Sequence, residues 1–183
     1  TRLQGHPHHE QIYAASAGGS SEPKHENTPG VENSSGPLAQ GMSVGVGMAI
    51  AGKMDNKPWR VYLVGSDGEM QEGQAWEAIM FAGNHKLDNL TYIIDRNNIQ
   101  IDGYTEKVNP LEPLHDKLKA FNFHVLEING NNMSEIIAAV KQSWTIKGRP
   151  TVILANTIPG YGVQFMTGDY TWHGKPPNKD QGD

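Results

Sequence analysis

The chain has 183 residues, a length that suits one domain with a single hydrophobic core. It contains no cysteine, which excludes disulfides, thiolate metal sites and cysteine nucleophiles and leads us to expect a cytoplasmic location. The formal net charge of −5 argues against a broad nucleic-acid-binding surface, so backbone N–H groups or a metal ion would have to hold an anionic ligand.

The first 35 residues predict no regular element. Residues 14–29 are mostly Ser, Gly, Glu, His and Lys with two prolines. Because such a segment buries too little apolar surface to order itself, we expect a mobile loop over about 9–29. No stretch is apolar enough to cross a membrane, and no signal-peptide pattern opens the chain. Since the chain begins at Thr1 without a Met, we expect an N-terminally incomplete domain.

From Gly36 onward, short apolar runs alternate with stretches of helical periodicity. The alternation indicates an α/β fold, a parallel sheet with helices on both faces. The residues from 159 onward are rich in Gly, Pro and Asn and predict a loop-rich tail over 159–183. In chain order, the pattern predicts a helix over 36–54, a strand over 60–64, a helix over 73–86, a strand over 90–94, a helix over 114–121, a strand over 123–128, a helix over 133–145 and a strand over 151–155.

Ligands of such sheets bind beyond the carboxyl ends of the strands, which here selects residues 65–73, 95–103 and 156–174. Asp67 follows one predicted strand, and Asn97 follows the next strand 30 residues later. Because neighbouring parallel strands end side by side, we expect the carboxylate and the amide oxygen to converge, with a backbone carbonyl near Ile99 as a third ligand. An all-oxygen set of this kind suits Mg²⁺ or Ca²⁺, and such an ion would neutralise a diphosphate.

The Gly65–Glu69 segment has a simpler interpretation, because an Asp-Gly pair after a strand is most often only a turn. In a functional site, the unencumbered backbone of Gly65 and Gly68 would let N–H groups approach phosphate oxygens. Neighbours in a turn seldom face one pocket, so Glu69 carries little weight as a partner of Asp67. The histidines near the N-terminus favour a solvated loop over a zinc site, since Pro7 breaks any helical face.

The segments GSDGEMQEGQAWEA and DRNNIQIDG together resemble the thiamine diphosphate motif, which opens with a Gly-Asp-Gly-type turn and closes on an Asn about thirty residues later. LQGHP, TPGVENSSGPLAQG, NHKLDNL and WHGKPPN resemble, in the same order, the N-terminal, cofactor-diphosphate-binding part of transketolase. The resemblance covers nearly the whole chain apart from residues 14–27. It implies the thiamine diphosphate-binding fold, with residues 1–183 as a single diphosphate-binding (PP) domain. One departure is Ser66, where the family usually has Gly.

The resemblance also implies roles for individual residues. The metal ligands would be Asp67 and Asn97 through their side chains and Ile99 through its carbonyl. The cofactor-binding residues would be Gly36, Leu38, Asp67, Gly68, Asn97 and Ile101. His6 and His173 would be catalytic, one near the reacting carbon and the other at a substrate hydroxyl, and Glu72 would lie at a dimer interface.

The activity that the resemblance implies is transfer of a two-carbon ketol unit from a ketose phosphate to an aldose phosphate, as in the pentose phosphate pathway, with thiamine diphosphate and Mg²⁺ (or Ca²⁺). The family's glutamate that activates the aminopyrimidine lies in a second, pyrimidine-binding domain, which does not fit in 183 residues. We therefore expect a split transketolase, active as a heterotetramer with a C-terminal subunit that carries that domain. The alternatives are a deoxyxylulose phosphate synthase-like enzyme, a 2-oxo acid dehydrogenase component or an inactive partner-binding subunit.

Overall fold

The computed structural model describes residues 12–17 and 31–182. Within these ranges, none of the helices combines the length and apolar character needed to span a bilayer. In chain order, the elements are β1 (Ile12–Ala17), β2 (Asn33–Ser35), α1 (Gln40–Met54), β3 (Arg60–Ser66), η2 (Glu69–Gln71), α2 (Gly73–Asn84), β4 (Leu90–Arg96), β5 (Ile99–Gln100), β6 (Gly103–Tyr104), α3 (Thr105–Val108), α4 (Leu114–Ala120), β7 (His124–Asn129), α5 (Met133–Ser143), β8 (Thr151–Asn156), η3 (Tyr170–Trp172) and α6 (Lys179–Gly182).

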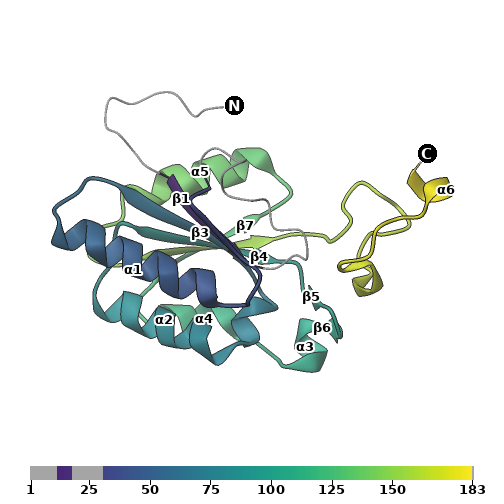
Figure 1. Ribbon diagram of the computed structural model, residues 1–183, viewed down its shortest axis with the longest axis horizontal. Coiled ribbons are helices and arrows are strands. Elements are labelled where there is room, and N and C mark those ends of the chain that lie inside the picture. Colours follow the sequence, from purple (N-terminus) through teal and green to yellow (C-terminus); the bar gives the residue numbers. More distant parts are fainter. Residues whose placement is uncertain (1–11, 18–30, 183) are drawn as a thin grey trace.

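Six of the described strands form one parallel sheet in the order β2-β1-β3-β4-β8-β7 (Figure 1). The central strands β3, β4 and β8 are nearly continuous apolar runs because both of their faces are covered. β8, the last of these strands along the chain, lies between β4 and β7. The predicted α/β class, with a parallel sheet, is confirmed.

Helices cover both faces of the sheet, with α1, α2 and α4 on one side and α5 on the other (Figure 1). Side chains alternate accordingly along β3. Leu63 packs against α1, where a Cβ on Gly45 would overlap the Leu63 side chain, so this glycine permits the close approach of helix and sheet. On the opposite face, Trp144 at the end of α5 donates a hydrogen bond from Nε1 to the hydroxyl of Tyr62 at 2.5 Å.

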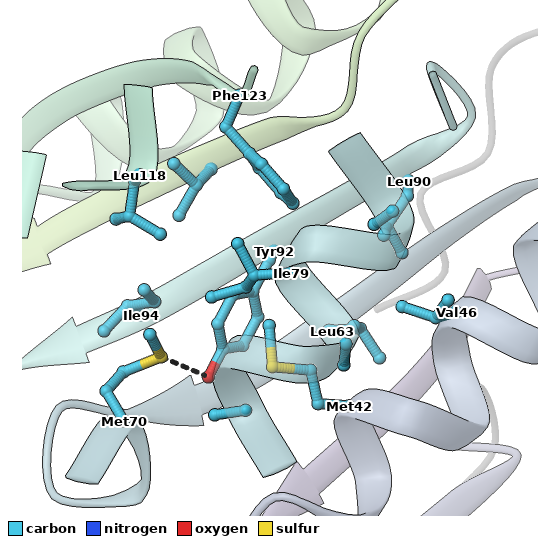
Figure 2. Close-up of a cluster of buried hydrophobic side chains, with 14 of the residues drawn as sticks. Met42, Val46, Leu63, Met70, Ile79, Leu90, Tyr92, Ile94, Leu118 and Phe123 are labelled. Carbon is cyan, nitrogen blue, oxygen red and sulfur yellow. Dashed lines mark hydrogen bonds between the residues drawn. The ribbon is translucent and has the colours of Figure 1, made fainter. Parts of the chain in front are cut away.

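The main hydrophobic core lies between the sheet and the helices α1, α2 and α4 (Figure 2). Each large apolar side chain buried there contributes about 1.5–3 kcal/mol relative to exposure. Tyr92 extends from β4 through this core, and its hydroxyl lies 3.7 Å from the sulfur of Met70 (Figure 2). The core residues labelled in Figure 2 are Met42, Val46, Leu63, Met70, Ile79, Leu90, Tyr92, Ile94, Leu118 and Phe123.

The N-terminal segment differs from expectation. The loop expected over 9–29 is wrong for residues 12–17, which form β1 and pair in parallel with both β3 and β2. The sequence IYAASA has strong strand formers only at its first two positions, so local propensity does not reveal this strand. The rest of that expected loop, residues 9–11 and 18–29, lies outside the described residues. Over 159–182 the chain contains only the short helical turns η3 and α6.

Candidate functional site

The turn after β3 and the loop after β4 meet at the carboxyl edge of the sheet. The strands pair in register up to Ser66 and Asp95, and the backbone N–H of Asp67 donates to the carbonyl of Asp95 at 3.2 Å. Asp67 is fully buried, and its Oδ2 accepts a hydrogen bond from the backbone N–H of Asn98 at 2.7 Å. The structure therefore brings Asp67 against the loop that carries Asn97 and Ile99, as the spacing predicts.

The two oxygens of the Asp67 carboxylate have different surroundings. Oδ2 also accepts from Arg96 Nη1 at 2.7 Å and from the Thr105 hydroxyl at 3.4 Å. Oδ1 is buried and accepts no hydrogen bond of normal geometry from any residue that the structure describes. Burial raises the pKa of Asp67, and its contacts with Arg96 and with the N–H groups of Asn98 and Gly68 offset only part of that rise. A buried carboxylate oxygen without a partner is costly, so Oδ1 is the atom at this edge that a bound cation would satisfy.

Asn97 is half-buried, and its amide is held by two contacts. Its Nδ2 donates to Asp95 Oδ2 at 3.2 Å, and its Oδ1 accepts from the backbone N–H of Ile99 at 3.0 Å. Asp95 is itself anchored by the hydroxyl of Thr157, from the loop after β8. Because an amide oxygen has two lone pairs, Asn97 Oδ1 keeps acceptor capacity for a further partner.

The carbonyl of Ile99 would be the third oxygen of the expected metal-binding set. A Cβ built on Gly68 would lie 3.6 Å from that carbonyl, so the turn after β3 and the backbone of β5 are in close proximity. Within the described residues no group of three or more His, Asp or Glu side chains is placed to hold a metal ion. A metal here would instead use a carboxylate, an amide and a carbonyl. This oxygen set, with the unsatisfied Oδ1, fits a hard divalent cation such as Mg²⁺.

Glu69 has a clear structural role that the sequence analysis missed. It is 2% exposed, and its Oε1 accepts a hydrogen bond from the backbone N–H of Ala39 at 2.6 Å. Ala39 has a φ of 63°, an unusual left-handed conformation for a non-glycine residue, and it precedes α1. Burial raises the pKa of Glu69, and its hydrogen bonds, including one to Tyr92, partly oppose that rise. Glu69 thus ties the segment containing Gly36 and Leu38 to the turn after β3.

The other residues expected at the cofactor line this edge to different degrees. Gly36 and Gly68 are half-buried, whereas the side chain of Leu38 is 43% exposed. Ile101, between β5 and β6, is 76% exposed and makes an apolar projection beside the candidate site. Glu72, expected at a dimer interface, is exposed immediately before α2.

The tail extends past the carboxyl edge and contacts the small β5–β6 hairpin (Figure 1). The Tyr104 hydroxyl donates to the carbonyl of Gly168 at 3.2 Å, and its ring meets Tyr170 edge-on with centroids 5.2 Å apart. His173 follows η3 and is exposed. The tail that carries His173 is therefore attached to the hairpin that begins at Ile99. His6, the other expected catalytic residue, lies outside the described residues.

Comparison with known proteins identifies the family. The sequence model of the family described as "Transketolase, thiamine diphosphate binding domain" matches residues 7–182, nearly the whole chain. The chain belongs to the transketolase family. The motif resemblance noted in the sequence is thereby confirmed, and so is the thiamine diphosphate-binding character of the fold.

Two of the curated relatives are named as transketolase subunits. The chain is 49% identical over 146 residues to the 6-deoxy-6-sulfo-D-fructose transketolase subunit SqwG of Clostridium sp. (strain MSTE9), covering 80% of this chain and 53% of that protein. It is 43% identical over 153 residues to an apulose-4-phosphate transketolase subunit of Phocaeicola vulgatus, covering 84% of this chain and 54% of that protein. The chain therefore spans about half the length of the curated relatives it matches.

Solved transketolase structures share the fold. The crystal structure of transketolase from Campylobacter jejuni superposes with a TM-score of 0.78 at 35% identity, covering 83% of this chain and 25% of that one. The small share of the longer chain shows that the present chain corresponds to only one part of a transketolase.

Proposed function

We propose that this chain is the thiamine diphosphate-binding subunit of a split transketolase, which transfers a two-carbon ketol unit from a ketose phosphate to an aldose phosphate. The observation that carries the proposal is the buried Asp67 Oδ1, which lacks a hydrogen-bond partner among the described residues, at the edge where Asn97 and Ile99 offer further oxygens. Membership in the transketolase family supports it.

In this proposal Asp67, Asn97 and the carbonyl of Ile99 hold Mg²⁺, with Ca²⁺ as the alternative ion. The backbone at Gly68 approaches the diphosphate, where no side chain would stand in the way. The apolar part of the cofactor would contact the segment of Gly36, Leu38 and Ile101, which presents exposed apolar surface next to the metal ligands. When bound, thiamine diphosphate supplies the electron sink for the two-carbon unit.

Proton handling falls to two histidines. His173 is exposed on a tail attached to the β5–β6 hairpin, so it would reach a substrate hydroxyl from outside the sheet edge. His6 would act near the reacting carbon. Histidine suits both tasks because it is the side chain that most readily exchanges a proton near neutral pH.

The active enzyme would require a second chain. Two relatives are named as transketolase subunits, and the present chain spans about half of each. We infer a C-terminal transketolase subunit with the pyrimidine-binding domain, assembled with this chain as a heterotetramer in which Glu72 lies at the interface. A cytoplasmic location stays an expectation. The named substrates of the two relatives, a sulfofructose and apulose 4-phosphate, suggest that the donor is an anionic ketose, with xylulose 5-phosphate as one representative.

The test combines the purified chain with its candidate partner subunit, thiamine diphosphate and Mg²⁺. Xylulose 5-phosphate with ribose 5-phosphate should give a seven-carbon sugar phosphate, and 6-deoxy-6-sulfo-D-fructose serves as the sulfonated alternative donor. Loss of product in Asp67→Asn, with partner binding retained, would support the proposed site. Absence of product with every donor would contradict ketol transfer, and pyruvate consumption would instead indicate another thiamine diphosphate enzyme. Partner binding without cofactor uptake would indicate an inactive subunit.

A further inference from the structure

Arg96 lies at the centre of a buried charged cluster to which the sequence analysis assigned no function. Its Nη1 donates to Asp67 Oδ2 at 2.7 Å and contacts the Thr105 hydroxyl at 3.1 Å. Its Nη2 donates to Glu106 Oε1 at 2.7 Å and to Glu112 Oε1 at 2.9 Å. The Arg96 side chain is 5% exposed, whereas those of Glu106 and Glu112 are 33% and 57% exposed. The guanidinium thus connects Asp67 to the surface through α3 and the loop that follows it.

This cluster leaves only one oxygen of Asp67 available. Oδ2 has three donors around it, namely Arg96 Nη1, the Asn98 N–H and the Thr105 hydroxyl, and these use its acceptor capacity. Oδ1 has none. A cation at this edge would therefore meet Asp67 through a single oxygen, with the second oxygen held away from it.

The number of carboxylate oxygens matters because Mg²⁺ and Ca²⁺ have different demands. Mg²⁺ requires an octahedral shell of six ligands at about 2.0–2.1 Å, which two oxygens of one carboxylate do not fit well. Ca²⁺ takes six to eight oxygens at about 2.3–2.6 Å and readily accepts both oxygens of a carboxylate. A carboxylate held to one oxygen therefore favours the smaller ion.

We propose that Arg96 is a positioning residue that restricts Asp67 to one-oxygen coordination and thereby biases the site toward Mg²⁺ over Ca²⁺. The proposal rests on the metal site of the proposed function, and it assigns to Arg96 the selection of Mg²⁺ over Ca²⁺ at that site. Arg96 touches neither substrate nor cofactor in this scheme and acts through Asp67.

The test must separate coordination from charge, because removing Arg96 alone also removes a positive charge near the ion. The double variant Arg96→Met with Glu106→Gln keeps the local formal charge, because it removes one positive and one negative group. In the wild type, Glu106 Oε1 accepts a hydrogen bond from the N–H of Leu111 at 3.1 Å, and the amide oxygen of Glu106→Gln can still accept it. Arg96→Lys is the conservative variant, since its ammonium can still donate to Asp67 Oδ2. Calorimetric titration of each chain with Mg²⁺ and with Ca²⁺, at saturating thiamine diphosphate, gives the ratio of the two affinities.

The double variant should shift this ratio toward Ca²⁺ by about tenfold, which corresponds to about 1.4 kcal/mol, while Arg96→Lys should stay within about threefold of the wild type. If the double variant does not fold, Thr105→Val removes one donor to Oδ2 without changing charge and should shift the ratio in the same direction by about twofold to threefold. An unchanged ratio in a folded variant overturns the inference and leaves the proposed function standing. Absence of cation uptake by the wild type, with or without the partner subunit, overturns both.

Discussion

Two stretches of the same carboxyl edge differ in a way that identifies the site. At the β7–β8 end, a hollow of about 480 Å³ opens beside Asn129, Asn131, Glu135 and Ile158. The polar groups there already have partners: Asn131 Oδ1 accepts from the N–H of Ile158 at 2.9 Å, and Glu135 Oε2 accepts from the N–H of Asn129 at 2.8 Å. The hollow is spacious, but the oxygens Asn131 Oδ1 and Glu135 Oε2 that line it already accept hydrogen bonds.

The β3–β4 end has the opposite character. Asp67, Glu69 and Arg96 are buried there, and Asp67 Oδ1 has no hydrogen-bond partner in the described part of the chain. Buried polar groups are nearly always hydrogen-bonded in folded proteins, so an unpartnered carboxylate oxygen beside the loop that carries Asn97 and Ile99 points to a missing ligand there, which an open volume by itself does not. The candidate site is therefore distinguished by an unpartnered buried oxygen and not by the volume of its cavity.

The largest effect should come from replacing Asp67 at the β3–β4 end, with replacement of Asn131 at the β7–β8 end as the control. Asp67→Asn should weaken Mg²⁺-dependent uptake of thiamine diphosphate by about 100-fold or more, because it removes the only charged metal ligand. Asn131→Ala, the control at the β7–β8 end, should leave that affinity within about twofold while lowering the free energy of unfolding by about 1 kcal/mol. Cofactor titration followed by denaturant unfolding measures both. Equal losses of cofactor affinity in the two variants would show that the β3–β4 end has no special role in binding.

A smaller effect concerns α1, whose N-terminus carries the Gly36–Ala39 segment of the β3–β4 end. Gly45→Ala should lower the free energy of unfolding by about 1–3 kcal/mol, because the new methyl group would overlap Leu63. Gly47 lies two residues further on the exposed side of the same helix, and a Cβ there would meet no atom of the described residues within 4 Å. Gly47→Ala should therefore raise stability by about 0.5–1 kcal/mol. Urea denaturation measures the free energy of unfolding of both variants. Similar changes in this free energy would contradict the close packing of α1 on β3.

The buried carboxylate of Glu69 predicts a pH dependence. Because burial raises its pKa, the folded state binds this proton more tightly than the unfolded chain does. The wild type therefore loses stability as the pH rises through the pKa of folded Glu69, whereas Glu69→Gln does not. The variant can still accept from the N–H of Ala39, and its amide can donate to the hydroxyl of Tyr92. The test is thermal unfolding between pH 4.5 and 8, a range that starts near the ordinary glutamate pKa of about 4.5. Over this range, the stability of Glu69→Gln should increase relative to that of the wild type as the pH rises. A difference that does not vary with pH would refute this account.

The smallest effect is expected at the opposite, amino-terminal edge, where Asp88 precedes β4. Lys53 Nζ lies 2.6 Å from its Oδ1, and the N–H of Gly148 donates to its Oδ2 at 2.8 Å. Partial burial raises the pKa of Asp88, but the contacts with Gly148 and Lys53 lower it further than burial raises it. The stabilisation is therefore present at neutral pH and lost as the pH falls through the lowered pKa.

Asp88→Asn should accordingly lower the free energy of unfolding by less than about 1 kcal/mol at pH 7, with cofactor affinity unchanged. Denaturant unfolding at pH 7 and pH 3.5, together with cofactor titration at pH 7, measures this. A change in cofactor affinity would show that the amino-terminal edge also contributes to the site, and the distinction between the edges would fail.

Much of the fold follows from local sequence pattern. The strands predicted at 60–64, 90–94 and 151–155 correspond to β3, β4 and β8, because long apolar runs between turn residues are typical of buried parallel strands. β1 was not predicted, because this strand forms through its pairing with a distant part of the chain. Tyr13 lies opposite Val61, 48 residues later (61 − 13). No local signal in a run of Ala and Ser reports such a distant partner.

The site was predictable to a similar extent. The convergence of Asp67 with the Asn97 loop follows from the rule that parallel strands end side by side. The roles of Glu69 and Arg96 do not follow from it, because they depend on the direction of each side chain. The tight turn at η2 directs Glu69 beneath α1, and Arg96 meets carboxylates from residues 67, 106 and 112 that no spacing rule connects. Charged residues next to a motif are expected to be solvated, and burial reverses that expectation here.

The position of β8 has a consequence for synthesis of the chain. β4 and β7 both pair with β8, yet β8 is the last of the three to leave the ribosome. Until residue 156 has emerged, these two strands have no neighbour between them, and the nascent chain exposes strand edges that can associate with other chains. Any truncation before β8 would leave the two sides of the sheet unjoined, so we expect shortened products to aggregate or be degraded rather than accumulate as folded fragments.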